Sequence, residues 1–194
     1  RPAVWLRALS TFGATISVAP NFGYGLAAEK VKEEQIEGVD LSSWRVALCG
    51  AEPVVPRVMR RFIDRFTPYG LRPEALTPVY GMSEATLAVT FSDLRSPFVS
   101  RCFDREALSR DERAVEAADG IELVSVGRPI AGTEVRVVDG NGVELEEGSV
   151  GDVFVRGPSI MDGYFNRPEA TREAIEDGWL DTGDRGFFDA GELF

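Results

Sequence analysis

Apolar residues recur at helical spacing in three segments near the start of the chain. One apolar face predicts a helix over residues 3–12, which Gly13 would end. Apolar side chains at every fourth position, surrounded by arginines, predict another helix over 54–66. Residues 22–35 begin with apolar and aromatic side chains and end in a charged run, which is typical of a helix with a solvated end.

Short apolar runs alternate with these helices. Runs at 14–19, 44–48 and 75–80 predict strands, and the strand–helix alternation favours a mostly parallel sheet with covering helices. Two of the strands end at glycine turns, Gly50 and Gly81. In a parallel sheet both turns would lie at the same edge, which would create a cleft.

After residue 91 the pattern changes. A charged, irregular connector over 93–119 is expected to hold one helix at 104–109, and short β-type segments follow. A short helix is expected to begin at 167–172, with Pro168 in its first turn. The expected strands and the hairpin turn lie at 121–126, 134–138, 139–142 (turn), 152–156, 178–180 and 186–189.

The predicted fold class is therefore α/β. A partial, mostly parallel sheet with covering helices is followed by a β-rich part, and we place the boundary between residues 1–118 and 119–194.

Composition restricts the chemistry. The 194 residues carry a net charge of −11, which argues against binding to nucleic acid, and no apolar run approaches the roughly 18 residues of a membrane span. Cys49 and Cys102 lack ligand spacing, which predicts reduced thiols and a cytoplasmic protein. The chain contains no histidine, so within it a Ser-His-Asp triad and a histidine zinc site are excluded. Both ends resemble cuts in a longer chain.

The most informative stretch is 78–86, where a strand meets a glycine turn that is expected to open a helix. Gly81 would let a ligand approach the backbone, Ser83 can donate to a phosphate oxygen, and Glu84 is an oxygen ligand suited to magnesium. The alternative is a plain helix start, with Ser83 as the N-cap and Glu84 as a first-turn acid.

Two further features allow two interpretations each. Asp184 is expected on a glycine-permitted turn between two strands, where it could accept from ribose hydroxyls or only bond its own backbone. The aromatic start of the second helix, Phe22 and Tyr24, could be core or the wall of an apolar pocket.

Taken together, four motifs resemble those of the adenylate-forming superfamily, which includes acyl-CoA synthetases, fatty acyl-AMP ligases and peptide-synthetase adenylation domains. They are residues 50–53, 80–84, 151–158 with 163–171, and 179–184, in the family's order. Within the superfamily, residues 41–53, 68–75 and 104–108 look most like fatty acyl-AMP ligases. That branch often has alanine at the position of Ser83. The serine of this chain keeps a hydroxyl able to bind phosphate.

The resemblance implies a role for each matching residue. Ser83 would contact the α-phosphate and Glu84 would hold magnesium, while Asp184 would bind the ribose hydroxyls. Asn21, Phe22 and Tyr24 match a part of the family that runs beside the acyl pocket. The loop of Gly50, Ala51, Glu52 and Pro53 would run along the adenine, and Tyr80 would lie against its ring. Gly81 and Met82 would line the nucleotide.

The implied reaction is attack of a fatty-acid carboxylate on ATP, giving acyl-adenylate and pyrophosphate. A carrier protein, or a polyketide or peptide synthase, is a possible partner of the complete protein. The family's phosphate loop is expected before Arg1 and its lysine-bearing lid after Phe194, so we expect the 194-residue piece alone to be inactive. Alternatives are a long-chain acyl-CoA synthetase and a catalytically silent nucleotide-binding or scaffold module.

Overall fold

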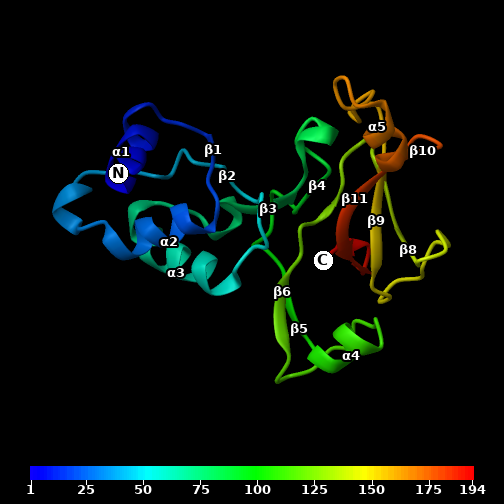
Figure 1. Cartoon of the computed structure of the whole chain (residues 1–194). Helices are drawn as coiled ribbons and strands as arrows, with labels where there is room; N and C mark the ends of the chain where they lie inside the picture. Colours follow the sequence, from blue (N-terminus) through cyan, green and yellow to red (C-terminus); the bar gives the residue numbers. More distant parts are fainter. The chain divides into compact units, whose positions relative to one another are not determined.

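The computed structural model describes residues 1–194, and their contacts divide the chain into two compact units. Unit 1 consists of Arg1–Val79 and Ser92–Ser100, and unit 2 of Tyr80–Phe91 and Arg101–Phe194. Figure 1 follows the chain through both by colour. The subdomain boundary predicted between residues 118 and 119 stays a prediction.

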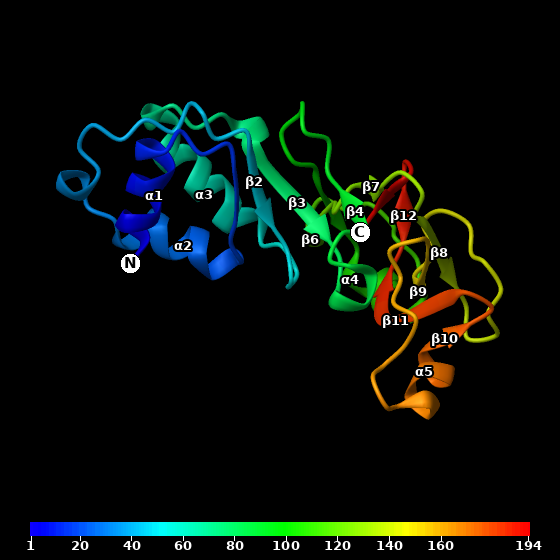
Figure 2. The same ribbon diagram turned by 90° about the horizontal axis from the view of Figure 1, so that it is seen from above.

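Unit 1 is built on three parallel strands in the order β1-β2-β3. They are β1 (Ile16–Val18), β2 (Val46–Cys49) and β3 (Leu76–Tyr80), the last residue of which belongs to unit 2. Cys49 pairs with Pro78, so β2 and β3 end at the same edge, as predicted. Figure 2 shows the helices of this unit on one side of β2 and β3. They are α1 (Pro2–Thr11), α2 (Asn21–Lys30), α3 (Pro56–Phe66) and the short 3₁₀ turns η1 (Glu33–Gln35), η2 (Thr67–Tyr69) and η3 (Pro73–Ala75).

Aromatic side chains form the centre of unit 1. Tyr24 and Trp44 stack with ring centroids 6.5 Å apart, and Phe62 meets Tyr24 edge-on at 4.9 Å. All three rings are fully buried. Phe62 and Phe66 belong to α3, whose apolar face follows the four-residue spacing seen in the sequence.

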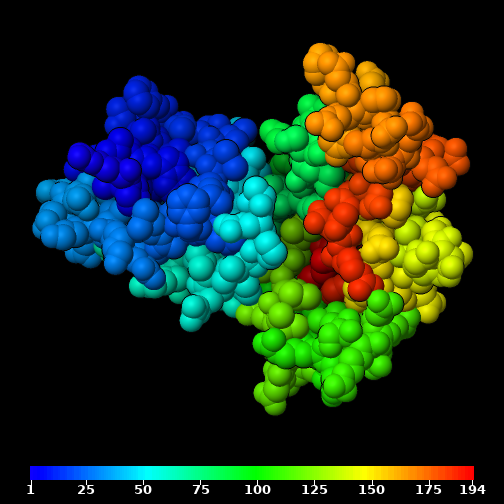
Figure 3. All heavy atoms as spheres, viewed as in Figure 1, coloured from blue at the N-terminus to red at the C-terminus, as the bar shows by residue number.

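Unit 2 is mainly β, and its largest sheet has the antiparallel order β10-β11-β9-β8. Figure 3 shows the orange-red segment of β11 against the yellow segment of β9. Two helices, α4 (Arg105–Arg110) and α5 (Pro168–Ala174), and one 3₁₀ turn, η4 (Ser83–Ala85), complete the unit. Its strands are β4 (Thr90–Phe91), β5 (Ser100–Phe103), β6 (Ile121–Val124), β7 (Arg128–Pro129), β8 (Glu134–Val138), β9 (Gly151–Arg156), β10 (Ile175–Glu176), β11 (Trp179–Gly186), β12 (Phe188–Asp189) and β13 (Glu192–Leu193). The first residue of β5, Ser100, belongs to unit 1.

The predicted α/β class is confirmed, with two corrections outside the candidate site. The helix predicted over 22–35 ends at Lys30, because Val31 has extended backbone and is buried in the core of unit 1. The connector over 93–119 contains the predicted helix but also β5, which pairs with β6. All the helices are too short or too polar to cross a lipid bilayer.

Candidate functional site

The turn that follows β3 differs from the predicted helix start. Only one 3₁₀ turn forms, η4, and it begins after Met82, so Ser83 is not the N-cap. Thr86 and Leu87 then have φ angles of 54° and 75°, and the backbone NH of Leu87 donates to the carbonyl of Met82 at 2.9 Å. This closed loop prevents an α-helix from continuing. The predicted α-helix start is therefore wrong, whereas the phosphate contact of Ser83 stays a prediction.

Gly81 is required by the turn itself. A Cβ at this position would lie 1.4 Å from the carbonyl oxygen of Leu87. Glycine at this position thus permits the close approach of the Leu87 backbone, and the nucleotide contact of Gly81 stays a prediction. Nearby, Ala85 is buried among valines of β8 and β9, which anchors the turn in unit 2 and leaves Ser83 exposed.

Asp184 lies in a bulge within one strand, β11, and not on a turn between two strands as predicted. The register with β9 shifts between Asp181 and Arg185, and Gly183 has a φ of 71°. Asp181 accepts from the backbone NH of Gly183 at 2.9 Å, so Asp181 performs the local backbone bonding that was the alternative role for Asp184. The bulge leaves the carboxylate of Asp184 exposed.

Tyr80 and Asp184 meet across 104 residues of sequence. The hydroxyl of Tyr80 donates to Asp184 Oδ2 at 2.7 Å. Burial raises the pKa of the Tyr80 phenol, and the neighbouring carboxylate raises it further, against an opposing hydrogen bond with Thr182. The Tyr80 hydroxyl therefore remains a neutral donor over the ordinary pH range.

Glu84 has a partner that the sequence analysis missed. The hydroxyl of Tyr164 donates to Glu84 Oε1 at 3.0 Å, and this bond raises the pKa of the Tyr164 phenol. Two backbone contacts accompany it: Met161 N donates to the carbonyl of Glu84 at 2.8 Å, and Thr86 Oγ1 donates to the carbonyl of Ser159 at 2.8 Å. The Gly-Tyr pair at 163–164 belongs to a family motif, which is the only sequence signal for this role.

The donor set for a metal is small. No group of three or more Asp, Glu, Cys or His side chains gathers anywhere in the chain. Glu84 is a half-buried carboxylate outside any such group. It fits a magnesium ion that is held mainly by phosphates and water, since such ions need only one or two protein carboxylates.

The loop after β2 belongs to unit 1, and Asn21 holds it. Asn21 N donates to Glu52 Oε1 at 2.9 Å, Asn21 Nδ2 donates to the carbonyl of Pro53 at 2.9 Å, and Val55 N donates to Asn21 Oδ1 at 2.8 Å. Within the loop, Ala51 has a φ of 67°. The side chain of Asn21 therefore fixes the shape of residues 50–53, a contact that periodicity gave no means to find.

The two aromatic side chains at the start of α2 differ in burial. Tyr24 is fully buried in the core, and its hydroxyl donates to the carbonyl of Leu48 at 2.8 Å, whereas Phe22 is 72% exposed. The structure gives Tyr24 a core role, one of its two expected interpretations. The assignment of Asn21, Phe22 and Tyr24 to an acyl pocket stays a prediction.

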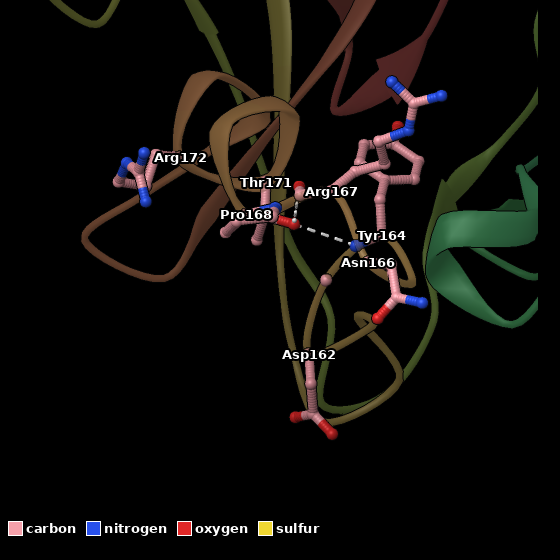
Figure 4. A pocket seen from close by; sticks show the side chains of 8 residues that line it. Asp162, Tyr164, Asn166, Arg167, Pro168, Thr171 and Arg172 are labelled. Carbon is pink, nitrogen blue, oxygen red and sulfur yellow. Dashed lines mark hydrogen bonds between the residues drawn. The ribbon is translucent and has the colours of Figure 1, made fainter.

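An open hollow of about 590 Å³ lies beside Tyr164 in unit 2, between the loop of residues 162–167 and α5. Figure 4 shows its side chains, with Thr171 of α5 bonded to the backbone of Tyr164.

Unit 2 thus contains two hydrogen-bonded pairs, Tyr80 with Asp184 and the newly found Tyr164 with Glu84. Met82 packs beside its core, and Ser83 lies on the same turn as Glu84. The predicted adenine-loop residues Gly50 to Pro53 and the predicted pocket residues lie in unit 1. The nucleotide-binding roles of all these residues stay predictions.

Comparison with known proteins assigns the chain to a family. The sequence profile of the family described as AMP-binding enzyme matches residues 1–165. A 4-hydroxyphenylalkanoate adenylyltransferase of Mycobacterium marinum is 40% identical over 210 residues, covering 100% of this chain and 34% of that protein. A putative fatty-acid–CoA ligase of Mycobacterium tuberculosis is 39% identical, covering 100% of this chain and 36% of that protein.

Comparison with solved structures leads to the same kind of enzyme. The fatty acyl-adenylate ligase of Legionella pneumophila, in complex with acyl adenylate and pyrophosphate, superposes with a TM-score of 0.92 at 38% identity. The match covers 100% of this chain and 36% of that one. The chain thus spans about a third of the length of the relatives it matches.

Proposed function

This chain belongs to the AMP-binding enzyme family, and we propose that it is part of an ATP-dependent ligase that joins a fatty-acid carboxylate to AMP and releases pyrophosphate. The observation that carries the proposal is the Tyr80–Asp184 hydrogen bond. It places a carboxylate suited to vicinal hydroxyls in the same unit as the carboxylate of Glu84. Two chemically complementary groups are thereby available for the sugar and the phosphates of one nucleotide.

In this proposal Asp184 accepts hydrogen bonds from the ribose hydroxyls, and Tyr80 lies against the adenine while keeping Asp184 oriented. Ser83, which is exposed on its turn, donates to an oxygen of the α-phosphate. The loop of Gly50, Ala51, Glu52 and Pro53, held by Asn21, borders the adenine. Gly81 and Met82 line the nucleotide.

The chemical difficulty of the reaction is electrostatic, because a carboxylate must attack an anionic phosphate. Binding both in line and directing donors at the phosphate oxygens lowers the barrier without a general base. Magnesium, bound through Glu84, would supply charge neutralisation at the phosphates. The absence of histidine is compatible with this chemistry.

The test is nucleotide binding by the complete protein. Calorimetry with an acyl-sulfamoyl adenosine should show about 10-fold to 100-fold weaker binding for Asp184→Ala, since a hydrogen bond to a charged group contributes roughly 1.5–3 kcal/mol. Asp119→Ala, which removes another exposed carboxylate of unit 2, serves as the control and should bind normally. Unchanged binding by Asp184→Ala would favour the catalytically silent module instead.

A second candidate is an acyl-CoA synthetase, because one similar protein is named as a putative fatty-acid–CoA ligase. Consumption of CoA by the complete protein distinguishes it from a ligase that passes the acyl group to a carrier protein. The name of another relative makes 4-hydroxyphenylalkanoates a necessary second substrate class in this assay. A cytoplasmic location and a carrier-protein or synthase partner remain part of the proposal for the fatty acyl-AMP ligase.

A further inference from the structure

We propose that Tyr164 is a positioning residue that orients the carboxylate of Glu84 toward the metal–nucleotide complex. The inference rests on the proposed function, and it extends that function to a residue outside the predicted site. The feature that carries it is a loop, residues 159–164, which contacts the turn bearing Glu84 at three points.

Two of these contacts fix the distance between loop and turn. The backbone NH of Met161 donates to the carbonyl of Glu84 at 2.8 Å, and Thr86 Oγ1 donates to the carbonyl of Ser159 at 2.8 Å. Both contacts lie at or just after Glu84 in the sequence, so they hold this part of the turn against the loop. Neither contact restrains the carboxylate itself.

The third contact restrains the carboxylate of Glu84 itself. The Tyr164 hydroxyl donates to Glu84 Oε1 at 3.0 Å. An ionised carboxylate has about four acceptor positions, so one donor leaves Oε2 and part of Oε1 available to a metal ion or its water. The bond therefore restricts the rotation of the Glu84 side chain without occupying its binding capacity.

The backbone of Tyr164 is itself hydrogen-bonded to a side chain of α5. Tyr164 N donates to Thr171 Oγ1 at 2.9 Å, and Thr171 Oγ1 donates to the carbonyl of Arg167 at 3.0 Å, as the dashed lines in Figure 4 show. The preceding Gly163 has a φ of 153°, and a Cβ there would lie 2.6 Å from Thr171 Cγ2. Glycine thus permits the close approach that lets Thr171 bind the loop.

This arrangement has the features of a support for a metal ligand. Carboxylates that bind metals are commonly hydrogen-bonded to outer groups, and removal of such a group typically costs about 10-fold to 100-fold in metal affinity or activity. Since Glu84 does not belong to a cluster of three or more metal-ligating side chains, its orientation matters more than it would in such a cluster. The Tyr164 ring is 39% exposed, so loss of its hydroxyl should leave the fold intact.

The experiment uses the complete enzyme and Mn²⁺ as a spectroscopic substitute for magnesium. Electron paramagnetic resonance titration in the presence of ATP should show that Tyr164→Phe needs about 10-fold more Mn²⁺ for half-saturation than the parent enzyme. Tyr69→Phe, which removes a tyrosine hydroxyl from unit 1, should behave like the parent. Thr171→Val should weaken Mn²⁺ binding in the same direction, whereas Thr171→Ser, which keeps the hydroxyl, should restore it.

A second measurement separates positioning from general damage. Binding of acyl-sulfamoyl adenosine without metal should be unchanged in Tyr164→Phe, because this ligand does not need the metal. Weakened binding there would indicate a structural role and overturn the inference.

The control Glu84→Gln separates this inference from the proposed function. If Glu84→Gln loses Mn²⁺ binding but Tyr164→Phe matches the parent or binds Mn²⁺ more tightly, the positioning role is wrong while Glu84 keeps its role. If Glu84→Gln binds Mn²⁺ normally, both the metal role of Glu84 and the positioning role of Tyr164 are wrong. Nucleotide binding by Asp184→Ala then decides independently whether the proposed function survives.

Discussion

Asp184 has a defined orientation because Tyr80 donates to one of its oxygens. Burial raises the pKa of the Tyr80 phenol, so its hydroxyl remains a neutral donor near neutral pH. A single strand bulge presents Asp184, and the end of β3 presents Tyr80. Orientation of the acceptor before binding lowers the conformational cost of binding a ribose.

Removal of the Tyr80 hydroxyl alone tests this orientation. In the complete protein, Tyr80→Phe keeps the ring that would face the adenine but frees Asp184. We expect about 3-fold to 10-fold weaker binding of acyl-sulfamoyl adenosine, the effect of one hydrogen bond of about 1 kcal/mol. The loss should be smaller than that of Asp184→Ala.

The double variant Tyr80→Phe/Asp184→Ala tests whether the Tyr80 hydroxyl acts through Asp184. If Tyr80 acts through Asp184, Tyr80→Phe should add little to the effect of Asp184→Ala in calorimetry. Fully additive losses would mean that the hydroxyl contributes by a separate route, and the orienting role would be wrong.

Among the single residues, sequence reasoning identified the carboxylates but not their partners. Tyr164 forms a hydrogen bond with a residue that lies 80 positions away in the sequence, and Asn21 with one that lies 31 positions away. Such contacts depend on the path of the chain between them, which neither hydrophobic spacing nor a local motif encodes. The bonds from Tyr164 to Glu84 and from Asn21 to Glu52 therefore became visible only in the structure.

At the scale of elements, the sequence predicted those with strong periodicity. The helix α3 and the strand β8 lie where spacing placed them, because each buries one regular face. Two of the failures are at η4 and β11, where residues with positive φ interrupt regular structure. Thr86 and Leu87 are not residues that sequence rules associate with such backbone, so the helix there was wrongly predicted.

The turn at Gly81 gives a test of this geometry. In Gly81→Ala the new Cβ would need the space of the Leu87 carbonyl, 1.4 Å away, so the turn must open. We expect the complete protein to lose roughly 1–3 kcal/mol of stability, as overpacked sites typically do, together with nucleotide affinity. Thermal unfolding and calorimetry measure the two effects.

Gly140→Ala is the matched control for that substitution. A Cβ at Gly140 would have no heavy atom within 4 Å, so stability and binding should match the parent. Equal behaviour of the two variants would contradict the close approach described for residues 81 and 87.

The turn after β8 predicts a pH dependence. Backbone NH groups of Val143 and Asn141 donate to Asp139 and hold the pKa of its carboxyl below the usual value. A lowered folded pKa means that the stabilisation is present above the unfolded pKa of about 3.9 and is lost as pH falls through the folded pKa. The parent protein should therefore lose stability on acidification below about pH 5.

Asp139→Asn removes that contribution, since the amide can still accept but does not titrate. Denaturant midpoints measured at pH 6 and at pH 3 should differ less for the variant than for the parent. An equal drop in both proteins would show that Asp139 does not contribute to the acid sensitivity.

For the molecule as a whole, function was easier to predict than geometry. Four motifs in a family order indicated nucleotide chemistry, and the family match over residues 1–165 confirms the class. The structure then assigned the candidate residues to two units, with Tyr80, Glu84 and Asp184 in one and residues 50–53 in the other. The chain spans about a third of the length of the related proteins.

The central claim is that the Asp184 site takes part in making an acyl-adenylate. The most direct measurement is mass spectrometry of the full-length protein incubated with laurate, ATP and magnesium, with CoA present in a parallel sample. The account predicts lauroyl-adenylate and pyrophosphate, no consumption of CoA, and a rate at least about 10-fold lower for Asp184→Ala. Adenylate formation at the parent rate by Asp184→Ala, or no adenylate from laurate or a 4-hydroxyphenylalkanoate, would contradict it.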